Sequence, residues 1–133
     1  MTVRIVRLGS ARAHGEGLRI GTVRHPPRGV PKREHASRNF YDVWLPDLAP
    51  SADLVRLGQR ATTGREWATF VKRYRREASA PEPRRILDLL AALSHHADFS
   101  VGCYCAEESR CHRSVLRALL VERGARIEGG SGG

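Results

Sequence analysis

Apolar residues alternate with polar or basic residues in two stretches near the start of the chain, residues 3–8 and 18–23. A period of two residues is typical of a half-buried β-strand. Residues 40–45 form a shorter candidate strand that Pro46 stops. Residues 99–105 are apolar enough for a strand buried within a sheet. The pattern therefore predicts four strands.

Helical spacing predicts three helices between the third and fourth of these strands, the first starting at Ser51 as N-cap and ending near Gln59. Thr63, with Glu66 three residues later, predicts a capping box at the start of the second. That helix has an apolar stripe, which we interpret as core packing: Trp67, Phe70, Val71, Tyr74 and Ala78. Its opposite face is basic and either contacts the phosphates of a nucleic-acid backbone or is simply solvated: Arg65, Lys72, Arg73, Arg75 and Arg76.

A third helix is predicted over residues 84–94, separated from the second by Pro81 and Pro83. Its leucine and isoleucine side chains are numerous enough to bury most of its surface. His95 and His96 follow its last turn, where a protonated imidazole suits the negative end of the helix dipole. We interpret both histidines as capping residues rather than metal ligands.

A last helix is predicted over residues 111–122, with Gly124 as its stop. Strands interleaved with helices, and a strand feeding a helix at the end, indicate an α/β fold with a largely parallel sheet flanked by helices in Rossmann-like layers. We expect residues 1–127 to form a single domain and residues 128–133 a flexible Gly/Ser tail.

The formal charge of +9 favours anionic partners such as nucleotides or nucleic acid. The alternative is an arginine-rich surface that merely reflects a GC-rich genome. No apolar run approaches the roughly 20 residues of a membrane span, so we expect a cytoplasmic protein that does not bind membranes. Three closely spaced cysteines argue against a disulfide framework. The oligomeric state is not indicated.

Residues 24–39 lack apolar periodicity and contain three prolines and Gly29, which predicts a long restricted loop. Five basic residues face a single acid, Glu34: Arg24, Arg28, Lys32, Arg33 and Arg38. Loops this long are usually functional or disordered. We favour a loop shaped over a site, and the alternative is a solvated basic loop.

The segment from Phe99 to Leu120 is the best candidate for a functional centre. A strand that passes through a loop into a helix leaves backbone N–H groups and the positive helix end above the strand, and these bind anions. Arg110, His112 and Arg113 reinforce that charge. Ligands of parallel sheets bind beyond the carboxyl ends of the strands. If the second and last strands are neighbours, the basic loop and the Cys-His-Arg loop share one cleft.

The cysteines leave three chemistries open. Cys103, Cys105, Cys111 and His112 offer the ligand types of a tetrahedral zinc site, but zinc sites commonly use Cys-x2-Cys knuckles and strand residues wrap an ion poorly. Cys105 or Cys111 is alternatively a thiolate nucleophile, although Glu107 and Glu108 repel a phosphate dianion. In the third, His112 is a general base beside an arginine clamp. Cys103 is alternatively a buried, inert thiol.

Short blocks in a fixed order give the chain a resemblance to a known family. They are Gly17-Leu-Arg-Ile ahead of Arg24, Pro27-Arg28-Gly29 with Lys32, Trp44, Ala49-Pro50-Ser51 with Leu54, the residues Trp67, Phe70, Tyr74 and Glu77, and the segment from Phe99 to Leu120. The chain resembles the YeaO-like branch of a large bacterial family of domains of unknown function. It has Pro26 where that family usually has Trp, and Cys-His-Arg where the branch often has Asn-His-Ala. The resemblance implies a compact α/β domain and supplies no activity.

We predict an uncharacterised domain that binds a phosphate-bearing ligand, nucleotide or nucleic acid, in a cleft lined by Arg, His and Cys. The candidate catalytic residues are His112, Cys105 and Cys111, and the candidate ligand-binding residues are Arg24, Arg28, Arg110 and Arg113. We assign no metal ligand, identify no cofactor and leave enzymatic activity open. One alternative is a non-catalytic nucleic-acid-binding protein, and a second is a thiol or metal protein.

Overall fold

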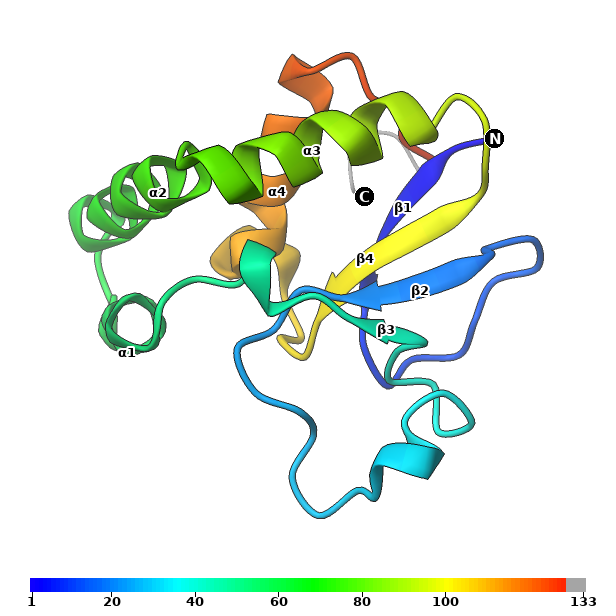
Figure 1. Cartoon of the computed structure of the whole chain (residues 1–133). Helices are drawn as coiled ribbons and strands as arrows, with labels where there is room; N and C mark the ends of the chain where they lie inside the picture. Colours follow the sequence, from blue (N-terminus) through cyan, green and yellow to red (C-terminus); the bar gives the residue numbers. More distant parts are fainter. Residues whose placement is uncertain (129–133) are drawn as a thin grey trace.

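Four parallel strands form one sheet in the computed structural model, which describes residues 1–128 (Figure 1). They are β1 (Val3–Arg7), β2 (Leu18–Gly21), β3 (Val43–Trp44) and β4 (Phe99–Cys103), in the order β1-β4-β2-β3. Val101 of β4 pairs with Ile5 on one side and with Ile20 on the other. The predicted α/β fold with a parallel sheet is confirmed. The predicted tail, residues 128–133, lies outside the described residues except for Glu128, whose amide donates to the Val3 carbonyl at 2.9 Å.

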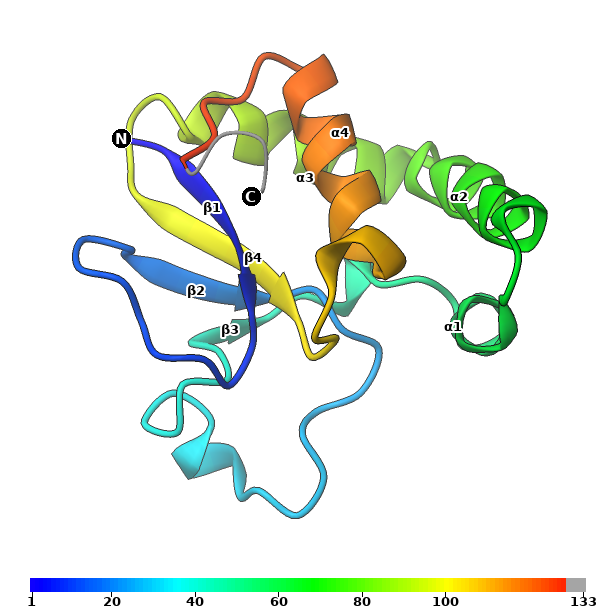
Figure 2. The same cartoon turned by 180° about the vertical axis from the view of Figure 1, so that it is seen from behind.

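Four helices flank this sheet: α1 (Ala52–Arg60), α2 (Gly64–Ala78), α3 (Pro81–Leu93) and α4 (His112–Glu122). In both cartoon views α2, α3 and α4 gather above the sheet, and residues 22–42 extend as a long loop below it (Figures 1 and 2). This loop, with one 3-10 turn at Lys32–Glu34, connects two parallel neighbours, β2 and β3. Within residues 1–128 no helix is long and apolar enough to cross a bilayer.

The predicted helix starts at Ser51 and Thr63 are confirmed. The Ser51 hydroxyl accepts a hydrogen bond from the Leu54 amide at 3.3 Å. Thr63 and Glu66 form the reciprocal capping box, each side chain accepting a backbone N–H of the other residue. Both signals depend only on residues three apart, so the local sequence is sufficient to specify them.

Two predicted element boundaries are wrong by three residues, and β2 and β4 end two residues before the predicted ends at residues 23 and 105. Helix α3 begins at Pro81, three residues before the predicted start at Arg84, because the first turn of a helix needs no backbone donor and tolerates proline. Strand β3 is limited to Val43–Trp44 rather than residues 40–45. Tyr41, which precedes it, is buried instead in a small second core beside the pocket described below.

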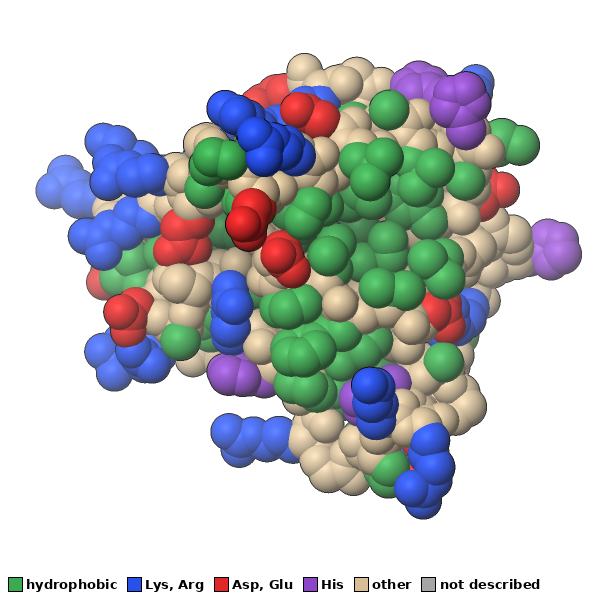
Figure 3. All heavy atoms as spheres, in the orientation of Figure 1, with side chains coloured by type: hydrophobic (Ala, Val, Ile, Leu, Met, Phe, Trp, Pro, Cys, Tyr) green, Lys and Arg blue, Asp and Glu red, His purple; other side chains and the backbone are tan. Residues whose placement is uncertain are grey.

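The main core lies between the helices and the sheet. Phe99, Leu87 and Leu116 are almost completely buried in it. Helix α3 buries less than its sequence predicts, since Leu89 is 62% exposed. In the orientation of Figure 1, hydrophobic side chains gather across the face turned to the viewer (Figure 3). Basic side chains project at the end of the molecule where α1 and α2 lie.

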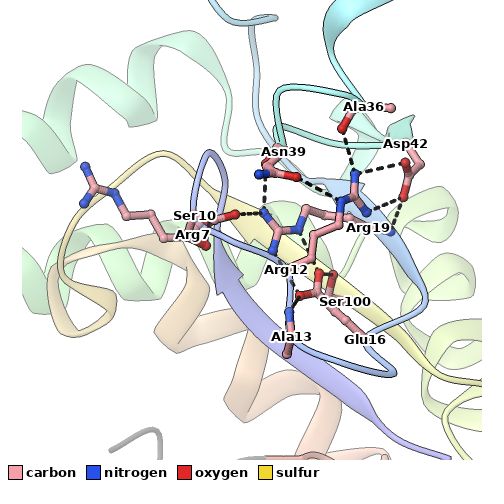
Figure 4. A network of polar contacts seen from close by, with 10 residues as sticks. All are labelled: Arg7, Ser10, Arg12, Ala13, Glu16, Arg19, Ala36, Asn39, Asp42 and Ser100. Carbon is pink, nitrogen blue, oxygen red and sulfur yellow. Dashed lines mark hydrogen bonds and ion pairs between the residues drawn. The ribbon is translucent and has the colours of Figure 1, made fainter.

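The buried Arg19 connects the loops before and after β2 to the sheet through hydrogen bonds (Figure 4). The Arg19 side chain is fully buried and donates two hydrogen bonds to the Glu16 carboxylate, at 2.7 and 3.0 Å. It also donates to the carbonyl oxygens of Ser10 and Asn39. Ser100 of β4 donates to Glu16 at 2.7 Å. Every polar atom of this buried pair therefore has a protein partner, and the loop that ends near Asn39 is fixed in place.

Candidate functional site

A pocket of about 600 Å³ opens where β2 and β4 end. Residues 23–28, which follow β2, line one side of it, and residues 103–105 and 110–112, which follow β4, line another. Aromatic and apolar side chains of other segments complete the wall, including Phe40, Trp67 and Phe70. The adjacency of β2 and β4 brings the two predicted loops into one pocket. Six of the seven candidate residues line it: Arg24, Arg28, Cys105, Arg110, Cys111 and His112.

His112 is the first residue of α4, and its ring is fixed from two sides. Its Nε2 lies 2.7 Å from the carbonyl oxygen of Thr22. A carbonyl only accepts, so Nε2 carries a proton, and in the neutral ring Nδ1 then presents a lone pair. The ring also packs edge-on against Tyr74, with centroids 5.6 Å apart. Nδ1 lies 3.8 Å from the Cys111 sulfur, so this nitrogen of the imidazole is the one nearest to that thiol.

The three thiols form one cluster at the pocket floor and none is in a disulfide. The Cys103 and Cys105 sulfurs lie 3.7 Å apart. Hydrogen bonds with the Cys103 and Cys111 thiols and the charge of Arg113 lower the pKa of Cys105 to about 3, although burial raises it. Hydrogen bonds to the other two thiols, with burial, raise the pKa of Cys103 well above its usual range. The three thiols therefore titrate as a coupled group.

Arg113 has a different place from the other candidates. It is 4% exposed, does not line the pocket, and donates to the Cys105 carbonyl at 2.6 Å. Its Nε is buried and has no hydrogen-bond partner within the described residues. The contact with the Cys105 carbonyl holds the loop over the helix start.

Arg24 also supports the pocket wall. Its guanidinium donates to the carbonyl oxygens of Ala49 and Pro50, each at 3.0 Å. The loop after β2 is thereby fixed to the segment that leads into α1. The Tyr104 hydroxyl donates to the His25 carbonyl at 3.0 Å and joins the two sides of the pocket directly.

Arg28 and Arg110 are exposed and line the pocket. Within residues 1–128 neither forms an ion pair or a hydrogen bond to another side chain. Arg110 lies over the Trp67 ring, with its guanidinium carbon 5.9 Å from the ring centroid. Both guanidinium groups are therefore available to an anion.

A family model described as "DUF488-N3a: Active DUF488-N3 subclade" matches residues 3–124. The chain belongs to the DUF488 family. No curated protein and no solved structure matches it significantly. The resemblance to a family of domains of unknown function is confirmed at this level.

Sequence reasoning missed the aromatic wall of the DUF488 pocket. Trp67 stacks on Phe70 with centroids 4.6 Å apart, and Phe40 meets Tyr104 edge-on. The helical stripe in α2 signalled a packing role for Trp67 and Phe70, which both have, but these residues also face the pocket. Phe40 and Tyr104 carried no comparable signal because they come from loops 64 positions apart.

The acidic residues of the loop do not crowd this DUF488 pocket. Glu108 pairs with Arg117 at 2.6 Å and lines no part of it. Its charge is neutralised within the fold, so it opposes an anion less than its position in the sequence implies. The pocket therefore combines unpaired arginines at its edge, aromatic walls, and a floor of thiols and imidazole.

Proposed function

We propose that the pocket binds a phosphate-bearing ligand of the nucleotide class and that the domain acts on it as an enzyme. The observation that carries this proposal is the position of Arg28 and Arg110, two exposed arginines without a protein carboxylate partner among residues 1–128, on the wall of an aromatic pocket. The name of the matching family model, which calls the subclade active, agrees with catalysis. We further propose the YeaO-like branch as the place of the chain within its family, on the ordered blocks from Gly17 to Leu120.

The pocket suits both halves of a nucleotide. Its volume of about 600 Å³ lies in the ordinary range of small-ligand sites. Trp67 and Tyr104 offer ring faces or edges to a base. Guanidinium groups bind phosphate oxygens in a bidentate manner, which fits the two arginines. Cys105, Cys111 and His112 then lie at the floor as the candidate groups for chemistry, and a reducing compartment such as the cytoplasm keeps their thiols free.

Titration calorimetry with the four ribonucleoside monophosphates and their nucleosides tests this proposal. We expect at least one nucleotide to bind, its nucleoside to bind more weakly, and Arg28→Gln to weaken the nucleotide roughly tenfold, since a charge-assisted hydrogen bond is lost. Arg33→Gln is the matched control, because Arg33 belongs to the same basic loop but does not line the pocket. Equal affinities for nucleotide and nucleoside, or equal effects of the two variants, would refute the proposal.

Nucleic acid is the second candidate ligand. Lys72, Arg73 and Arg76 are exposed on α2, the helix whose Trp67 lines the pocket. A non-catalytic binder that uses this face predicts a log affinity for oligonucleotides that falls steeply with log salt concentration. It also predicts that Lys72→Gln weakens binding while Arg28→Gln does not. The reverse pattern supports the pocket.

A further inference from the structure

We propose that Cys103, Cys111 and His112 bind one zinc ion at the floor of the pocket. Among residues 1–128 these three bring their ligand atoms together, all within 4.8 Å of one another. Two thiolates and one imidazole are the protein ligands of a known type of catalytic zinc site, in which the fourth position takes water or substrate. The site goes beyond the binding of a phosphate-bearing ligand and does not depend on it.

The fold removes the objection that strand residues wrap an ion poorly. Cys103 ends β4, and the chain leaves the strand, forms a 3-10 turn at Glu108–Arg110 and returns at Cys111, the N-cap of α4. The second cysteine therefore comes back over the end of the strand that carries the first. His112 follows immediately and approaches from the β2 side through its contact with Thr22. Three ligands thus converge from two directions although no Cys-x2-Cys knuckle exists.

The distances fit a small ion. The ligand atoms of tetrahedral zinc lie roughly 3.5–3.8 Å apart, given bonds near 2.0 Å to nitrogen and 2.3 Å to sulfur. The Cys111 sulfur and the His112 Nδ1 are already 3.8 Å apart. The remaining pairs, at no more than 4.8 Å, close by small rotations about the side-chain bonds.

The histidine is oriented as a metal ligand is. A ligating imidazole almost always donates its other N–H to a carbonyl or carboxylate, which fixes the ring and the tautomer. His112 donates Nε2–H to the Thr22 carbonyl at 2.7 Å, and its Nδ1 lies 3.8 Å from the Cys111 sulfur. The contact with Thr22 is independent of the cysteines and gives a second indication of a site.

Charge and protons balance on binding. Zinc carries two positive charges, and Cys103 and Cys111 bind it as thiolates, so the two thiol protons leave for solvent and the complex is neutral. A neutral site costs little in a buried place, and both Cys103 and Cys111 are buried. Cys105 is exposed and is not among the three clustered ligands, so it stays uncoordinated beside the open position. In the proposed enzyme that position takes water or a ligand atom, a step that rests on the proposed function.

Metal analysis of the full chain purified under reducing conditions, without any nucleotide, tests the site. We expect about one zinc ion per chain, and about one equivalent of Co²⁺ after its removal, with visible bands of tetrahedral cobalt and near-ultraviolet thiolate charge-transfer absorption. Less than about 0.1 zinc per chain with no cobalt spectrum would overturn the proposal.

Variants locate the ligands. Cys103→Ser, Cys111→Ser and His112→Gln should each weaken zinc at least roughly tenfold, while Cys105→Ser and the exposed His96→Gln should retain it. If Cys105→Ser loses zinc as His112→Gln does, the three-ligand assignment is wrong. Circular dichroism checks that each variant folds. If a variant does not fold, the cobalt spectrum of the unaltered protein tests the zinc site instead. Since nucleotide binding is measured separately, failure of one proposal leaves the other standing.

Discussion

Glu16 and Arg19 form an ion pair that is almost fully buried, with side-chain exposures of 2% and 0%. Neutralising one partner of such a pair destabilises the fold, because the other charge is then buried without a partner. Hydrogen bonds from Ser100 and Ala13 satisfy the remaining carboxylate positions. The pair therefore fixes the loop before β2 and contributes to stability in a manner that depends on pH.

We expect Glu16→Gln to lower the free energy of unfolding by about 3 kcal/mol at neutral pH. Burial raises the pKa of Glu16, but hydrogen bonds from Arg19, Ser100 and Ala13 and the charge of Arg19 outweigh it and lower the pKa from 4.5 to about 2. A depressed pKa gives stability that is present above 4.5 and lost as the pH falls toward 2. Urea unfolding across this range should show the difference from the unaltered protein shrinking with acid. Glu34→Gln, at an exposed carboxylate, should change stability little at any pH.

The capping box of α2 gives a second prediction. Thr63→Ala should cost about 1 kcal/mol, because the Glu66 amide loses its acceptor at 3.1 Å. Thr69→Ala, at an exposed position in the same helix, should be neutral or slightly stabilising, since alanine is the better helix former. Thermal unfolding of both variants measures the difference. Equal losses would show that the box adds nothing to the stability of α2.

The elements of this fold were largely predictable because their signals are local. The caps at Ser51 and Thr63 and the apolar periodicity of α2 depend on neighbouring residues, and each led to an element that the structure contains. The start of α3 at Pro81 was missed because proline usually indicates the end of a helix, although the first turn of a helix tolerates it. The strand order β1-β4-β2-β3 joins segments up to 96 residues apart, and no local pattern encodes it.

The candidate site was predictable in part from a general rule of parallel sheets. Because ligands bind at the carboxyl ends of the strands, neighbouring second and last strands would bring the two loops together, and residues 24–28, 103–105 and 110–112 do line one pocket. The burial of Arg113 could not be read from the sequence, since a charged residue at a helix start is usually exposed. The return of Cys111 over Cys103 likewise depends on the path of the loop, which the spacing of the cysteines does not specify.

Two glycines with positive φ should respond differently to alanine. Gly17 has φ +78°, and an added Cβ would lie 2.0 Å from the backbone oxygen of Asp98. Gly29 has φ +71° but nothing within 4 Å. We expect Gly17→Ala to cost about 3 kcal/mol or more, from the clash and the backbone strain together, and Gly29→Ala about 1 kcal/mol from the strain alone. Chemical unfolding compares them, and a similar cost for both would contradict the close approach at Gly17.

The contact between Arg110 and Trp67 makes ligand binding visible by fluorescence. The chain has two tryptophans, and Trp44 lies outside the pocket, with its Nε1 donating to the Val23 carbonyl at 2.8 Å. In a Trp44→Phe variant the emission therefore comes from Trp67 alone. We expect a nucleotide that binds the pocket to change this emission in a saturable manner, because it contacts the ring or displaces the guanidinium above it.

Adding Arg110→Gln to that variant should weaken the nucleotide roughly tenfold, since a charged donor to phosphate is replaced by a neutral one. It should also change the emission before any ligand is added, because the Trp67 ring loses the cation that covers it. The converse variant, Trp67→Phe with Trp44 retained, should show no saturable response. A response that survives in Trp67→Phe, or an affinity unchanged by Arg110→Gln, would place the ligand outside this pocket.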